Sequence, residues 1–243
     1  MKTTLLMLCL PLLIAFSDGE PDKDDPEFRK VFPRKDTTDE IIKSYTGGTK
    51  RAPDFLVVHA DPKAGQYWEL FSDSLDIETT VRRQVSRIDG DFALIERRMT
   101  TRAEMFQSDY VIAFRVNLKA EAGKPNIDRA WIGKPDEAPT LIKVRERKDT
   151  DALPAEAKKS VPFEGLELAG NIWRGELFIS VDEEMTTQIW VAEGGYFDAI
   201  VKTTVDDDYL EQLRSYGGDA DDLMLWPEKW QEAGAPQDPP KPD

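Results

Sequence analysis

The chain has 243 residues, with 47 acidic and 32 basic side chains, one His and one Cys. Its net charge of −15 argues against nucleic-acid binding, because phosphate contacts require clustered Lys and Arg. Cys9 lies in a segment that we expect to be removed. The mature chain would then have no thiol for disulfides, Cys-ligated zinc, iron–sulfur clusters or nucleophilic catalysis. The single His excludes a metal site built from several His, so we expect no metal and no cofactor.

Residues 1–17 are typical of a secretory signal peptide. Lys2 supplies the positive start, residues 5–16 are an apolar run broken only by Pro11, and Ala15-Phe16-Ser17 fits the small-x-small cleavage pattern. The run is too short to span a bilayer, which takes about 20 residues. We therefore expect an exported protein, periplasmic or extracellular, without a transmembrane span. A buried N-terminal strand and a lipoprotein lipidated at Cys9 are the alternatives.

Composition divides the rest of the chain. Residues 18–39 are mostly charged or Pro and cannot bury enough apolar surface to offset their ordering entropy, which indicates a disordered charged linker. Residues 227–243 carry five Pro and end in Pro-Pro-Lys-Pro-Asp, which indicates a disordered Pro-rich tail. The sequence thus predicts one folded domain over residues 40–226.

Within this domain the apolar residues recur mostly with a period of two, which predicts strands. After an apolar run at residues 55–60, we expect strands over residues 66–71, 77–88, 92–100, 110–118, 127–133, 140–147, 171–181, 186–192 and 198–205. The connections between the last three are too short for a crossover and predict a meander. At residues 208–217, Tyr209, Leu213 and Tyr216 have helical spacing, and Gly217 follows as a C-terminal cap, which predicts a short C-terminal helix.

Asp89-Gly90 between two alternating runs predicts a hairpin with a two-residue turn. The register that follows puts Arg82 opposite Arg97, and like charges directly opposed are destabilising. These two arginines are a candidate anion site. The alternative is that both side chains turn to solvent or meet acidic residues of a neighbouring strand.

In the strand over residues 171–181, the odd positions Trp173, Leu177, Ile179 and Val181 are predicted to point inward. Aromatic residues of several strands could line an apolar cavity on a curved sheet or form an ordinary packed core. The candidate ligand-binding residues are Trp68, Tyr110, Phe114, Trp173, Leu177 and Trp190.

The residues give little support for catalysis. His59 is the only imidazole, and no Gly-x-Ser-x-Gly motif supplies a nucleophile for it, so we interpret it as structural. The Asp clusters at residues 206–208 and 219–222 suit calcium, but they are better explained as helix starts. Paired carboxylates for hydrolysis stay open, because 47 acidic residues allow no choice of two.

Several short motifs resemble those of uncharacterised exported bacterial β-sheet proteins: residues 65–70 (GQYWEL), residues 131–135 (WIGKP) and residues 173–175 (WRG). Residues 188–192 (QIWVA), Gly194-Gly195 and residues 200–202 (IVK) loosely resemble a strand–turn–strand of LolA- and LppX-type half-barrel lipoprotein carriers. The resemblance covers about residues 55–205. It implies a half-barrel sheet that holds acyl chains on its concave face.

We therefore expect a mainly β protein, a curved antiparallel sheet or half-barrel meander with a short C-terminal helical segment. The function expected first is non-enzymatic: an exported envelope protein that binds an apolar ligand, a lipid or an envelope partner through the sheet. The alternatives are an exported hydrolase with paired carboxylates and a purely structural or interaction module.

Overall fold

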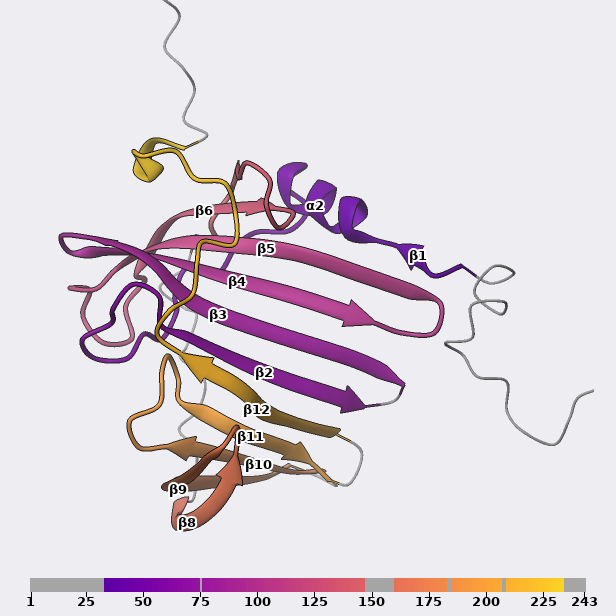
Figure 1. The fold of residues 1–243 in the computed structure, drawn as a ribbon, viewed down its shortest axis with the longest axis vertical. Coiled ribbons are helices and arrows are strands. Elements are labelled where there is room, and N and C mark those ends of the chain that lie inside the picture. The colour runs from indigo at the N-terminus through magenta and orange to yellow at the C-terminus, as the bar shows by residue number, and fades with distance from the viewer. Residues whose placement is uncertain (1–32, 75, 147–159, 183–184, 207–208, 234–243) are drawn as a thin grey trace, which may run out of the picture. The chain divides into compact units, whose positions relative to one another are not determined.

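The computed structural model describes residues 33–74, 76–146, 160–182, 185–206 and 209–233 (Figure 1). They form one mainly β unit, in which all twelve strands belong to a single sheet. Along the sheet the order is β7-β6-β5-β4-β3-β2-β12-β11-β10-β9-β8, and β7 and β8 do not pair, so the sheet is open. Neighbours on this path are antiparallel, and only the short β1 pairs in parallel, with β5. The predicted mainly β class with an antiparallel sheet is confirmed.

The elements have the following bounds. They are β1 (Lys35–Asp36), the helix α2 (Thr38–Thr46), β2 (Tyr67–Ser74), β3 (Ile77–Asp89), β4 (Phe92–Arg102), β5 (Phe106–Asn117), β6 (Ile127–Gly133), β7 (Thr140–Ile142), β8 (Ser160–Leu168), β9 (Asn171–Asp182), β10 (Met185–Ala192), β11 (Ile200–Val205), β12 (Tyr209–Gly217) and the 3₁₀ turn η1 (Trp230–Glu232).

The sequence pattern located most of these strands, including the meander β9-β10-β11, but it missed β8. Pro162 and Gly165 interrupt the alternation there, and both residue types are unfavourable inside a central strand. In the structure β8 is the last strand of the sheet, and its register against β9 shifts between Phe163 and Leu166. An edge position and a bulge are the two settings in which a strand accepts Pro and Gly.

The predicted C-terminal helix is wrong, because residues 209–217 form the strand β12 between β2 and β11. A bulge explains the misleading pattern. The register against β2 shifts between Leu213 and Ser215, so that Leu213 pairs with Leu70 and Tyr216 pairs with Trp68. The extra residue brings Leu213 and Tyr216, three positions apart, onto one face of the sheet, and three-residue spacing is also the signature of a helix.

The β3–β4 hairpin is present, but its turn is one residue later than predicted. Asp89 pairs with Phe92, so the two turn residues are Gly90 and Asp91. Gly90 has φ +59° and Asp91 is not among the residues with positive φ, a combination that fits a type II′ turn with Gly in first place. A bulge at Ser86 then shifts the register again, and Arg83 rather than Arg82 lies opposite Arg97.

Replacing Gly90 by Val is expected to lower the free energy of unfolding by about 1–2 kcal/mol, because a β-branched residue resists positive φ. A Cβ at this position would meet no atom within 4 Å, so the cost would come from the backbone rather than from a clash. Gly218→Val is the control, since Gly218 also has open space but no positive φ. Equal denaturation midpoints for the two variants would contradict a tight turn at Gly90.

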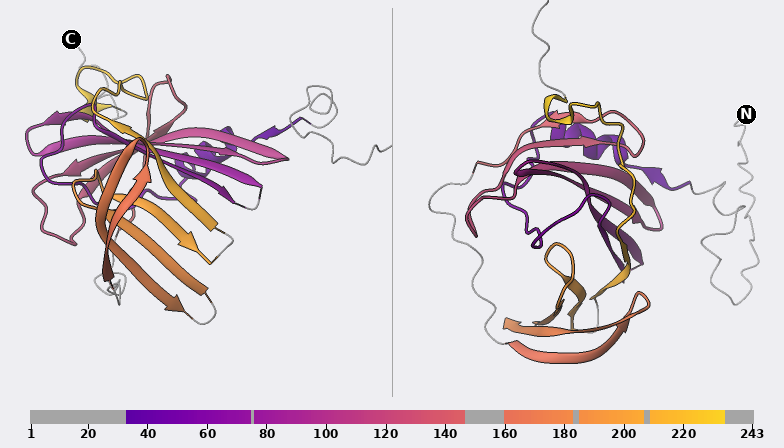
Figure 2. Two further views of the ribbon diagram at one scale, coloured as in Figure 1. Left: turned by 60° about the horizontal axis from the view of Figure 1, so that its bottom comes forward. Right: turned by 60° about the vertical axis from the view of Figure 1, so that its left-hand side comes forward.

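The two faces of the sheet carry separate cores. The face that we call the inner face bears Trp68, Leu70, Ile95 and Phe114, against which α2 and residues 52–58 pack. Trp173 of β9 belongs to the same cluster and lies 5.4 Å from Trp68 between ring centroids, so the sheet curves until its two halves meet (Figure 2).

The opposite face, here the outer face, is covered by the C-terminal segment of residues 219–233, which crosses the strands of the first half (Figure 1). Its Met224, Trp226 and Trp230 pack on Trp131, whose indole N–H donates to the Ala233 carbonyl at 2.7 Å. The Pro-rich tail expected from residue 227 onward is therefore ordered on the sheet as far as Ala233. Residues 234–243 lie outside the described residues.

Glu96 of β4 holds the C-terminal segment on the outer face through hydrogen bonds. Its carboxylate is fully buried on the outer face and accepts five hydrogen bonds. Three come from the segment: the Leu223 and Met224 backbone N–H groups at 2.7 and 3.0 Å and the Trp226 indole at 2.8 Å. The other two come from Gln84 Nε2 at 3.2 Å and the Ser86 hydroxyl, so the bulge residue also faces this carboxylate.

The N-terminal boundary also differs from the prediction. Ordered elements begin with Lys35 and the helix α2, inside the segment expected to be linker. The expected signal peptide and residues 18–32 of the linker lie outside the described residues. In the described part of the chain, neither helix has the length and apolarity that a membrane crossing needs.

Candidate functional site

The structure places four of the six predicted ligand-binding residues in the packed core of the inner face. Trp68, Tyr110, Phe114 and Trp173 are at most 8% exposed. Their polar atoms are used internally: the Trp68 indole donates to the Ile200 carbonyl at 2.8 Å, and the Trp173 indole to the Leu168 carbonyl at 3.0 Å. These four residues are placed to stabilise the fold.

Leu177 and Trp190 are cross-strand partners on β9 and β10, and both are only half-buried. Lys202 Nζ lies 4.8 Å from the centroid of the Trp190 ring. The inward alternation predicted for β9 holds at Trp173 but fails at the far end of the strand, where Val181 is 70% exposed. Beyond the aromatic core this strand has little opposite it to pack against.

The two arginines of the predicted anion site do not meet, because Arg82 pairs with Arg98 and Arg97 with Arg83 on the other face. Three of these four arginines have partners. Arg98 binds both oxygens of Asp109, Arg83 binds both oxygens of Asp198 at 2.6 and 2.7 Å, and Arg82 lies over the Tyr67 ring.

Arg97 is the exception. In the described part of the chain no carboxylate lies within ion-pair distance of it, and its buried Nε has no partner. Its Nη2 contacts the Met99 sulfur at 3.0 Å. Burial lowers the pKa of the Arg97 guanidinium, and the neighbouring charge of Arg83 lowers it further.

Arg97→Met is expected to leave the free energy of unfolding unchanged or raise it by about 1 kcal/mol or more, because it removes a buried charge that has no counter-charge. Arg83→Met is the matched variant, expected to cost about 3 kcal/mol, since it leaves Asp198 without its bidentate partner. Urea titration of both variants tests the assignment. Similar losses for the two would mean that Arg97 has a stabilising partner.

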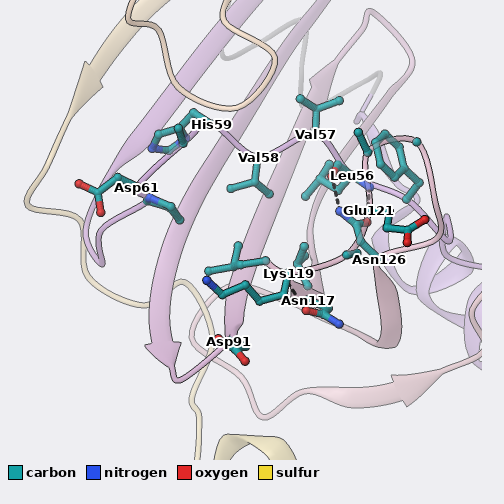
Figure 3. A pocket seen from close by; sticks show the side chains of 18 of the residues that line it. Leu56, Val57, Val58, His59, Asp61, Asp91, Asn117, Lys119, Glu121 and Asn126 are labelled. Atoms are coloured by element: carbon teal, nitrogen blue, oxygen red, sulfur yellow. Dashed lines mark hydrogen bonds between the residues drawn. The ribbon is translucent and has the colours of Figure 1, made fainter.

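A pocket of about 600 Å³ opens at the end of the sheet where the β3–β4 hairpin turns (Figure 3). One wall is the segment of residues 55–62, and the facing wall is residues 116–123, the end of β5 with the loop that follows. The hairpin tip at Gly90 and Asp91 and the side chain of Asn126 complete it. None of the six predicted ligand-binding residues lines this pocket.

The wall segment of residues 55–62 contains the apolar run of residues 55–60, and it pairs with no strand of the described sheet. Leu56 and Val58 pack against the inner-face core, whereas Val57 is 45% exposed. Figure 3 shows Val57 and Val58 pointing to opposite sides of the segment, which is the alternation of an extended chain. The segment thus runs as an extended chain along one side of the pocket.

His59 anchors this segment to the loop between β10 and β11. The Phe197 backbone N–H donates to His59 Nδ1 at 3.1 Å, so in the neutral ring the proton lies on Nε2, which donates to Gln66 Oε1 at 2.9 Å. The imidazole also stacks on Tyr196, with ring centroids 4.9 Å apart. Both ring nitrogens are occupied, so His59 holds the pocket wall in place.

Four charged side chains lie around the pocket: the acidic Asp61, Asp91 and Glu121 and the basic Lys119 (Figure 3). The pocket is therefore net negative. Among the described residues, no three or more His, Cys, Asp or Glu gather closely enough to hold a metal ion.

Two carboxyls with a raised pKa lie outside the pocket lining. Burial raises the pKa of Glu96, although its hydrogen-bond donors oppose the shift, and burial also raises the pKa of Glu211. Glu96 is on the outer face, and Glu211 pairs with Ser72 in the row next to Leu213 and Leu70 on the inner face. The sheet separates the two, so they do not form the carboxylate pair that a hydrolase requires.

Sequence reasoning missed the pocket because its walls are loops and a strand-like segment without a partner. The available signal was the turn at residues 61–65, which ends the apolar run. Compared with known proteins, the chain matches no family model, and no curated protein resembles it significantly in sequence.

Proposed function

We propose that this chain is an exported, non-enzymatic envelope protein that binds an apolar ligand or an apolar segment of an envelope partner. The binding site would be the pocket between residues 55–62 and residues 116–123. The observation that carries the proposal is its volume of about 600 Å³, which is within the ~300–1,000 Å³ typical of ligand sites. Its lining supports an apolar occupant, since it includes Phe55, Leu56, Val57, Val58, Val116 and Leu118.

This location replaces the aromatic residues of the inner face as the proposed site. Those aromatics are packed against one another, and a ligand could reach them only by opening the core. The pocket, in contrast, is bordered by the half-exposed side chains of Leu118 and Val58 and the exposed side chain of Val57. Binding there requires no separation of the two halves of the sheet.

Val57→Asp is expected to weaken binding of the uncharged fluorophore N-phenyl-1-naphthylamine at least tenfold, because it places a charge in the apolar lining. The matched control is Val181→Asp, at an exposed position that does not line the pocket. Neither variant should change the free energy of unfolding by more than about 0.5 kcal/mol. Wild-type binding by the Val57 variant, or no fluorophore binding by the wild type, would contradict the proposal.

A further inference from the structure

In the pocket wall, Leu56 is the last residue whose backbone N–H and C=O groups are hydrogen-bonded before an unpaired stretch begins. At Leu56, the side-chain amide of Asn126 acts as a neighbouring strand would: Asn126 Oδ1 accepts from the Leu56 N–H at 2.9 Å, and Asn126 Nδ2 donates to the Leu56 carbonyl at 2.8 Å (Figure 3). Asn126 itself lines the pocket. The hydrogen-bonding edge of Leu56 therefore faces the pocket side.

The next four residues, Val57 to Ala60, have no such partner. Within the part of the chain that the structure describes, none of their backbone N–H or C=O groups is hydrogen-bonded to protein. The first positive φ of this stretch is at Asp61, φ +54°, and the extended stretch ends in a bend at Ala60 and Asp61. In an extended chain alternate residues present their backbone groups to the same edge, so Val58 and Ala60 share the edge of Leu56.

An open strand edge beside an apolar pocket favours one class of occupant. An acyl chain in the pocket would cover these N–H and C=O groups without pairing them, and each buried unpaired group costs about 1–3 kcal/mol. An extended peptide would pair them and place alternate side chains in the apolar lining, which is the strand-addition mode of peptide recognition.

The charges specify the peptide further. Asp61, Asp91 and Glu121 around the pocket outnumber Lys119, so basic residues flanking the apolar ones would be attracted and acidic residues repelled. We infer that the pocket takes an extended, basic-flanked apolar peptide segment, which adds as a strand along the edge of Val58 and Ala60. This inference rests on the proposed function of the same pocket and names its partner class.

The test uses the full chain unchanged and varies only the peptide. The parent probe is fluorescein-labelled Lys-Val-Thr-Val-Thr-Val-Lys amide, measured by fluorescence anisotropy. Two further peptides carry N-methyl groups on alternate residues, one on the Val positions and the other on the Thr positions. A strand added to one edge uses the N–H groups of alternate residues only, and the Val/Thr alternation resists a one-residue slip.

We expect the parent to bind, one methylated peptide to bind within about twofold of it, and the other to bind at least tenfold more weakly. Replacing both Lys by Glu should weaken binding at least fivefold at low salt, with the difference shrinking in 0.5 M NaCl. Equal binding of the two methylated peptides would overturn strand addition. A parent that fails to bind while N-phenyl-1-naphthylamine binds would overturn it too and leave the proposed function standing. Failure of both probes would overturn both.

Discussion

Glu96→Ala is expected to cause a severe loss of stability, about 3–5 kcal/mol in the free energy of unfolding. The substitution leaves five donors without their acceptor on the outer face, including the Leu223 and Met224 amides and the Trp226 indole. Removing one partner from a buried, hydrogen-bonded charge costs this much because the remaining groups stay desolvated. Chemical denaturation measures the loss.

A conservative variant and a control variant accompany the Glu96→Ala measurement. Glu96→Gln keeps one acceptor oxygen but turns an NH₂ group toward donors, so an intermediate loss is expected. Glu78→Ala on the neighbouring strand is the control, because Glu78 is exposed and should change stability by less than about 0.5 kcal/mol. Emission from Trp226 and Trp230 should shift to the red in Glu96→Ala as the C-terminal segment leaves the outer face. Equal stability of the Glu96 and Glu78 alanine variants would contradict the anchoring role.

Trp68→Ala is expected to cost about 3–5 kcal/mol, the usual range for a large aromatic residue removed from a core. Trp68 is fully buried and contacts Trp173, Tyr196 and Tyr216, with ring centroids 5.4–5.9 Å away. Its indole also satisfies the Ile200 carbonyl. The residue therefore joins the two halves of the sheet across the inner face, and its loss should weaken the whole domain.

Trp68→Phe separates packing from hydrogen bonding. It keeps most of the apolar volume but leaves the Ile200 carbonyl unpaired, so a loss of about 1–3 kcal/mol is expected. Binding of N-phenyl-1-naphthylamine by the folded fraction should be the same in Trp68→Phe and in the wild type. Lost binding with unchanged stability would instead place Trp68 in a ligand site, as the sequence alone suggested.

Period-two alternation located most of the strands within a few residues of their bounds. It predicted β6 with its bounds at residues 127–133 and came within a few residues for β3 and β4. The failures come from bulges, which no local pattern reveals. The bulge in β12 produces helix-like spacing, and the bulge at Ser86 moves Arg83 opposite Arg97.

The candidate site was less predictable for a different reason. Large aromatic residues on strands suit a cavity and a core equally, and the choice depends on what lies opposite them. Here Trp68 and Trp173 meet each other across the curved sheet. The pocket depends on Val57 to Ala60 lacking a strand partner. This is a property of the tertiary structure and cannot be inferred from their apolar sequence.

Hydrogen exchange with mass spectrometry, in the presence and absence of N-phenyl-1-naphthylamine, tests whether the pocket between residues 55–62 and residues 116–123 is the binding site. The amides of residues 57–60 have no protein acceptor and should exchange fast in the free protein. The fluorophore is expected to slow exchange in peptides covering residues 55–62 and 116–123 and to leave exchange in residues 171–192 unchanged. Protection confined to residues 171–192, or no protection at saturating fluorophore, would contradict binding in this pocket.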